Sequence, residues 1–262
     1  MKSLPGVPFT VPLVANAIAF FVLYGMQLVD GQYLQLVLGL SPLQAGLWTI
    51  PSALGYMLGS ALAPRIANRL SPRAALGASV LVSAAGFGLL VGVPAGGGLP
   101  LFVVATVVLS IGLAPVYVVA TGLAVSAAPE RHAGRASALL ETCTELGGAF
   151  GIAVLGSVAG VVFRSRMTGT PPAGITADAW REARSTIGRS VDVARDLPAS
   201  LAADLLDAAR SAFSAAMQTV PLVGSVLLLA TAGAVVVLLR RTESPRPQQS
   251  PHARTGGRDD VA

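Results

Sequence analysis

The residues best suited to chemistry are three acids that lie in apolar stretches, Glu141, Glu145 and Asp30. Glu141 and Glu145 are four positions apart, so in a helix both carboxylates share one face and feel each other's charge. If that helix begins near residue 134, the two acids lie about 10 and 16 Å along it, at roughly 1.5 Å per residue. Glu145 is then near the middle of a hydrocarbon layer ~30 Å thick, and Asp30 lies near the outer boundary of its own helix.

An acid inside a membrane span is a functional hypothesis by default, because a charge at mid-membrane costs about 2.5–3.5 kcal/mol on insertion scales. No Lys or Arg lies deep inside any apolar stretch as a partner. Such acids can hold protons while the site is dry or open outward, and release them when a cation binds. This favours proton-coupled cation export through Glu145, Glu141 and Asp30. Two alternatives remain: Glu141 reaches water at the inner boundary, so that only Glu145 matters, and Asp30 is a solvated helix-end residue.

The composition indicates a membrane scaffold for these acids. Of the 262 residues, 53% are hydrophobic and 12% charged, whereas a soluble domain carries about 25% charge. Apolar runs of roughly 20 residues, which cross a bilayer, recur six times. The sequence predicts an all-α membrane protein with one domain over 1–241 and spans at about 11–38, 42–66, 74–93, 100–125, 134–163 and 212–239. Residues 164–211, with nearly balanced charge, are expected to be an outward loop, and 242–262 a disordered cytoplasmic tail.

Basic residues in the short loops predict the orientation of the helices. Lys2 precedes the first span, Arg240 and Arg241 follow the last, and arginines lie after the second and fourth spans. The loops after the first and third spans contain no basic residue. Because short loops rich in Lys and Arg stay cytoplasmic, we expect a multi-pass protein of the plasma (inner) membrane, surrounded by lipid, with both termini cytoplasmic.

Several small, polar and aromatic residues suggest how the spans pack. Gly147-x-x-x-Gly151 and Gly156-x-x-x-Gly160 let another helix approach closely, either for packing or for sliding. Three prolines interrupt spans and either kink them beside a cavity or are tolerated by neighbouring helices: Pro51, Pro115 and Pro221. Five further side chains either line a path for a lipophilic cation, which aromatic faces attract, or serve packing: Asn16, Tyr24, Gln27, Tyr56 and Tyr117.

Other function classes are disfavoured by the residues available. The net charge is +5, but the basic residues never form a Lys/Arg-rich block, so nucleic acid is not an expected partner. The single cysteine, Cys143, excludes an internal disulfide and a multi-cysteine metal site. His132 and His252 lie outside the spans, so no span offers a histidine for a Ser/His pair or a zinc site. We expect no enzyme activity, no metal and no cofactor.

Two segments resemble a known family. The run QYLQLVLGLSPLQAGL at 32–47, followed by Pro51, resembles the start of the C-terminal half of major facilitator drug:proton antiporters with fourteen helices. The run ETCTELGGAFGIAVLGS at 141–157 resembles the penultimate helix of the QacA/EmrB-type branch, in which two acids at this spacing recur before Leu-Gly. The resemblance covers about residues 9–241. It implies that Glu141 and Glu145 serve proton coupling and cation recognition.

The sequence also departs from that family. In the loop at 59–73, Asn68 stands where the family has an acid and Ser71 where it has a glycine, so a charge-relay gate is not expected there. The family's N-terminal half has no counterpart, although facilitators build their site between two six-helix halves. We therefore expect the C-terminal half of a multidrug efflux transporter for small lipophilic cations, acting with an N-terminal half or by self-association. The alternative is a truncated, non-transporting membrane protein or an interaction partner of a transporter half.

Overall fold

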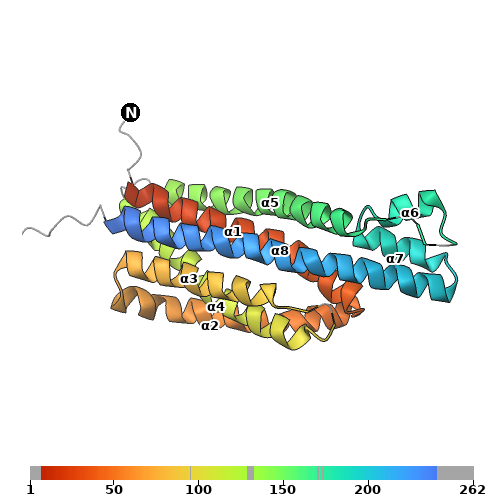
Figure 1. The fold of residues 1–262 in the computed structure, drawn as a ribbon. Coiled ribbons are helices and arrows are strands. Elements are labelled where there is room, and N and C mark those ends of the chain that lie inside the picture. The colour runs from red at the N-terminus through yellow and green to blue at the C-terminus, as the bar shows by residue number, and fades with distance from the viewer. Residues whose placement is uncertain (1–6, 95, 129–132, 170, 173, 241–262) are drawn as a thin grey trace, which may run out of the picture.

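The fold is a helical bundle, seen in a computed structural model that describes residues 7–94, 96–128, 133–169, 171–172 and 174–240. Within these residues six long helices occur: α1 Val7–Gln32, α2 Pro42–Arg69, α3 Pro72–Val91, α4 Leu99–Ala127, α5 Ala133–Arg166 and α8 Ala199–Arg240. A π-helix, η1 Tyr33–Val37, extends α1, and the short helices α6 Ala177–Ala183 and α7 Ile187–Arg195 connect α5 to α8. Helices α1, α5 and α8 form one side of the bundle and α2, α3 and α4 the other, while α6 and α7 lie at one end (Figure 1).

The all-α membrane fold is confirmed, with one difference among the six expected spans. Five helices in the described part of the chain are long and apolar enough to cross a membrane: Phe9–Val37, Arg73–Val91, Leu99–Ser126, Ala133–Arg166 and Ala199–Leu238. Helix α2, the expected span 42–66, packs along α4 as the sixth long helix, but polar positions such as Thr49, Ser52 and Ser60 make it less apolar. A helix with polar positions on several sides is poorly matched to lipid all round.

The segment between α5 and α8 differs from the expected loop. Helix α8 begins at Ala199 rather than at 212, and α6 and α7 occupy much of the remaining segment. Leu205 and Ala209, four positions apart, are buried, whereas the residues between them are exposed or half-buried, so the start of α8 is amphipathic. The nearly balanced charge of this segment reflects solvated helix faces, with exposed pairs such as Arg210–Asp207 at 3.4 Å. The expected tail, 242–262, lies outside the described residues.

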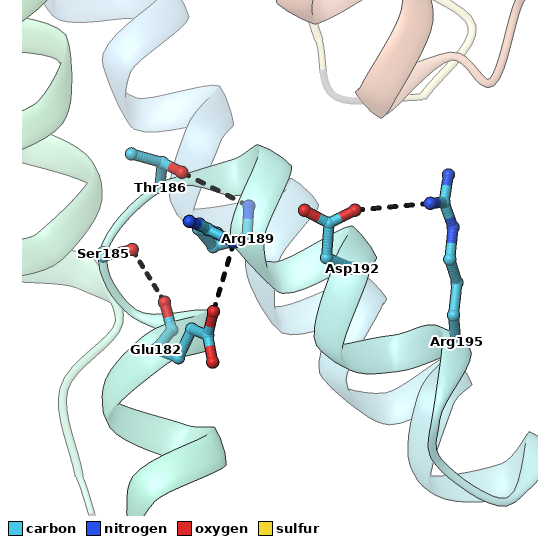
Figure 2. Close-up of polar contacts among 6 residues, drawn as sticks. All are labelled: Glu182, Ser185, Thr186, Arg189, Asp192 and Arg195. Carbon is cyan, nitrogen blue, oxygen red and sulfur yellow. Dashed lines mark hydrogen bonds and ion pairs between the residues drawn. The ribbon is translucent and has the colours of Figure 1, made fainter.

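A buried tryptophan and a few polar contacts hold together the segment between α5 and α8, here called the outer segment because α6 and α7 lie at one end of the bundle. Trp180 of α6 is buried, and its indole N–H donates a hydrogen bond to the Gly169 carbonyl at 3.3 Å. The Ser190 hydroxyl of α7 donates to the Ala183 carbonyl of α6 at 2.7 Å. Figure 2 shows the exposed side of the same junction, where Arg189 of α7 pairs with Glu182 of α6 at 3.3 Å. The segment is therefore a small packed unit beyond the spans.

Glycines bring α1 and α5 into backbone contact. A β-carbon added at Gly147 would collide with the Ala17 carbonyl oxygen, and one at Gly151 would collide with the Phe21 carbonyl oxygen. The predicted close packing at Gly147-x-x-x-Gly151 is thus confirmed, since only a residue without a side chain fits at either place. The second predicted pair behaves differently, because Gly156 faces the Leu28 side chain and Gly160 faces Arg164 of its own helix.

Replacing Gly151 by Ala should separate α1 from α5, because backbone atoms of Phe21 cannot move aside as a side chain can. We expect the variant to lose about 1–3 kcal/mol of stability, the usual range for overpacking, measured as a lower thermal unfolding midpoint of the detergent-purified protein. Gly122→Ala is the matched control, since open space surrounds that helical glycine. An equal midpoint for both variants would contradict the contact.

Replacing Trp180 by Ala should loosen the outer segment without disturbing the spans. The lost packing of a buried tryptophan typically costs about 3–5 kcal/mol, and it acts mainly on α6 and α7. We expect faster proteolytic cleavage between residues 167 and 198 in reconstituted protein, with the exposed-surface variant Arg181→Ala as control. Unchanged cleavage would mean that the tryptophan does not hold the segment.

Candidate functional site

Glu141 and Glu145 lie on an exposed face of α5, beside its buried stripe. The Tyr117 hydroxyl of α4 donates a hydrogen bond to Oε2 of Glu141 at 3.1 Å. Glu145 has no hydrogen bond or ion pair to any described residue. Tyr24 of α1 lies within electrostatic range of both carboxylates, and its ring packs against Gly148 one turn beyond Glu145. The two predicted acids therefore lie one turn apart on the same exposed face of α5 and differ in their contacts.

Aromatic side chains from three other helices form a connected group beside the pair, in which Tyr117 and Tyr24 are the members linked to the glutamates. The Phe20 ring of α1 meets the Tyr24 and Tyr117 rings edge to face, at centroid distances of 5.8 and 5.9 Å. Tyr56 of α2 lies within electrostatic range of Tyr24 and of Tyr117. The faces of such rings carry negative charge density that attracts organic cations. Two carboxylates and four aromatic rings from α1, α2, α4 and α5 thus meet in one region, here called the carboxylate site.

The position of Tyr117 follows from local features of α4. Pro115 precedes it by two residues and has no N–H, so it leaves the Ile111 carbonyl without its helical donor. Gly59 of α2 packs directly against that carbonyl oxygen, where an added β-carbon would lie at 2.5 Å. Helix α4 continues through the proline, which supports the alternative that neighbouring helices tolerate it. The close approach of α2 also brings Tyr56 toward the carboxylate site.

A buried hydrogen bond fixes the rotation of α5 relative to α1. Asn16 is fully buried, and its side-chain N–H donates to the Thr144 hydroxyl at 2.6 Å. Thr144 in turn donates to the Leu140 carbonyl at 2.9 Å. Because Thr144 points inward and immediately precedes Glu145, the bond directs both glutamates to the exposed side. This contact supports the packing alternative for Asn16, although its Oδ1 atom is buried without a hydrogen-bond partner; Gln27 is exposed.

Asp30 lies apart from the pair. It is on α1, six residues beyond Tyr24, or about 9 Å along the helix, and it is half-buried. Its Oδ1 atom is buried and has no hydrogen-bond partner. The π-helix η1 begins three residues later, a local distortion that often accompanies functional sites. The three predicted site residues thus separate into a carboxylate pair on α5 and an isolated acid near the end of α1.

Sequence reasoning found the two acids but missed part of their surroundings. Phe20, which joins the Tyr24 and Tyr117 rings, was not among the candidates, because one phenylalanine in an apolar span carries no signal of its own. The described residues contain no group of three His, Cys, Asp or Glu side chains that could hold a metal ion. Cys143 is half-buried beside a small apolar cluster.

Several known proteins are similar to this chain in sequence, and the three described here are named as efflux, export or resistance proteins. The chain is 35% identical over 234 residues to the multidrug efflux pump LfrA of Mycolicibacterium smegmatis, covering 89% of this chain and 46% of the pump. It is 30% identical to the tetracenomycin C resistance and export protein of Streptomyces glaucescens, covering 95% and 48%. It is also 30% identical to the methyl viologen resistance protein SmvA of Salmonella typhimurium, covering 82% and 43%. The chain spans about half the length of the curated relatives it matches.

The fold comparison agrees with these matches. A bacterial homologue of the human lysosomal transporter Spinster, solved in an inward-facing and unoccupied conformation, superimposes with a TM-score of 0.56 at 16% identity, covering 88% of this chain and 48% of that one. The sequence profile of the Major Facilitator Superfamily matches residues 13–180. With its apolar helices, the chain is a multi-pass membrane protein of a transporter family rather than of an enzyme family, and it belongs to the Major Facilitator Superfamily.

Proposed function

We propose that this chain is the C-terminal half of a proton-coupled multidrug efflux transporter of the fourteen-helix QacA/EmrB type, exporting small lipophilic cations. The observation that carries the proposal is the carboxylate site: two acids on one face of α5, next to four aromatic rings and without an ion pair in the described part of the chain. Glu145 and Glu141 are the coupling residues, and Asp30 is a third acid nearer the outer end.

The chemistry of the site suits exchange of protons for a cation. Carboxylates held near mid-membrane are stable when protonated, or when a cation neutralises them, because an unpaired charge there is costly. Binding of a lipophilic cation therefore displaces protons, and protons arriving from outside displace the cation. The rings add attraction for a flat or bulky organic cation. Multidrug and methyl viologen resistance among the relatives supports this substrate class, since methyl viologen is an organic dication.

The exposure of the carboxylate site supports a need for a partner. Glu141 and Glu145 are exposed on α5, and carboxylates cannot face hydrocarbon without large cost. The same helix exposes Leu146, Phe150 and Val154, and α2, across the site, is the long helix of the described bundle that is not apolar enough to span a membrane alone. A second six-helix half laid over α2 and α5 would cover these surfaces and enclose the site. We propose an N-terminal half or a second copy of this chain in that place, within the plasma membrane and with cytoplasmic termini.

The direct test is a chimera in which this chain replaces the matching segment of LfrA. We expect reconstituted chimera to expel methyl viologen in response to an inward pH gradient, and to stop when a protonophore removes the gradient. The same export assay with this chain produced alone shows whether self-association is enough for transport. Properly inserted chimera that exports no organic cation under any gradient would favour the alternative, a non-transporting membrane protein.

Within the chimera, Glu145→Gln should lower gradient-driven export roughly a hundredfold, the low end of the effect of removing a proton-transferring side chain. Glutamine keeps the size of the side chain but cannot exchange a proton. Membrane insertion and the unfolding midpoint should be unchanged, and Glu182→Gln on the outer segment is the matched control. Export by Glu145→Gln with the pH dependence of the unmodified chimera would refute the assignment.

A further inference from the structure

The two carboxylates of the site have unequal partners. Glu141 accepts the hydrogen bond from the Tyr117 hydroxyl at 3.1 Å, whereas Glu145, one turn away on the same face, accepts none from any described residue. Both side chains are exposed on α5, so burial does not distinguish them. The difference lies in the one tyrosine of α4 that reaches the first acid and not the second.

The side chain of Tyr117 is positioned by an aromatic contact. Its ring meets Phe20 of α1 edge to face at 5.9 Å. The side chain is half-buried. Its hydroxyl therefore presents a fixed donor to α5, and Glu141 is joined through it to α4 and α1 at once.

We propose that Tyr117 gives the two carboxylates different roles. It holds Glu141 as the carboxylate that binds the cation and leaves Glu145 as the carboxylate that takes up and releases the proton. This rests on the proposed function and goes beyond it, because nothing in the exchange scheme alone distinguishes the two acids. Tyr117 is a positioning residue, since it acts through Glu141.

The contacts of each acid suit its role. A carboxylate held by a charge-assisted hydrogen bond keeps one orientation, so less freedom is lost when a cation binds. Protonating the same oxygen would require that bond to break or reverse. Glu145 can rotate and protonate without losing any such bond. The other titratable groups facing the pair are Tyr24 of α1 and Tyr56 of α2. Four ion pairs between described residues lie at 178–210, away from the two glutamates.

The first test needs neither a partner half nor transport. Dicyclohexylcarbodiimide adds to protonated carboxyl groups in apolar surroundings and forms a stable N-acylurea, which mass spectrometry locates on the peptide. In the chain reconstituted into nanodiscs, Glu145 should be labelled about tenfold faster than Glu141, the factor expected from one hydrogen bond to a charged group. Tyr117→Phe should raise labelling of Glu141 to the rate of Glu145.

Tyr33→Phe is the matched control, because it removes a tyrosine hydrogen bond, to the Pro94 carbonyl, away from the site. It should leave the labelling pattern unchanged. Equal labelling of both glutamates in the unmodified chain, or a pattern that Tyr117→Phe does not alter, would overturn the proposal. An unfolding midpoint of Tyr117→Phe equal to that of the unmodified chain excludes misfolding as the cause.

The second test measures methyl viologen binding to the chimera in a double-mutant cycle. Tyr117→Phe and Glu141→Gln should each weaken binding, and the double variant should bind no more weakly than Glu141→Gln alone. Effects that multiply would show that Tyr117 does not act through Glu141. A chimera that neither binds nor exports contradicts the proposed function, while the carbodiimide pattern still decides whether Tyr117 distinguishes the two acids.

Discussion

The carboxylate site depends on the backbone contact between α1 and α5. Gly147 and Gly151 pack against the carbonyl oxygens of Ala17 and Phe21, and this contact brings Phe20 and Tyr24 beside the two glutamates. Each glycine in a helix costs roughly 1 kcal/mol relative to alanine, and close packing of the two helices offsets that cost. The Asn16–Thr144 hydrogen bond then fixes the rotation. Distance between the helices and rotation about their axes are thus set by separate residues.

Helices α2 and α5 differ from the other long helices in the residues that they bury and expose. Most long helices bury residues on several sides, but α5 keeps a single buried stripe and exposes both large apolar residues and acids. Helix α2 presents buried small residues to α4, among them Gly55 and Gly59, and exposes Trp48, Leu54 and Met57. Surfaces that mix apolar and polar groups suit contact with protein and a water-filled cavity better than contact with lipid. The exposed surfaces of α2 and α5 are therefore better suited to contact with protein than the lipid-facing surfaces of the other helices.

Apolar run length predicts most of the fold, because a span must be both long and hydrophobic to cross a bilayer. The same reasoning fails for α6, α7 and the start of α8. Their few buried apolar residues, such as Trp180 and Leu205, lie among charged residues and form no long apolar run. The acid pair is predictable from its spacing within one helix. The Tyr117–Glu141 bond is not, because the partners lie on different helices and only helix packing brings them together. The separation of Asp30 from the pair also could not be predicted, because it too depends on how α1 packs against α5.

Helix α8 runs without interruption for 42 residues, about 63 Å at 1.5 Å per residue and roughly twice the hydrocarbon thickness. The helix packs against α3, α5 and α1 of the bundle and also against α7, and Leu205 and Ala209 are buried near its start. Because Pro221 does not end the helix, α8 is one rod. A small tilt of α8 within the bilayer would therefore become a larger sideways displacement at the end of α8 that lies beyond the spans, and α7 and α6, which pack there, would move with it.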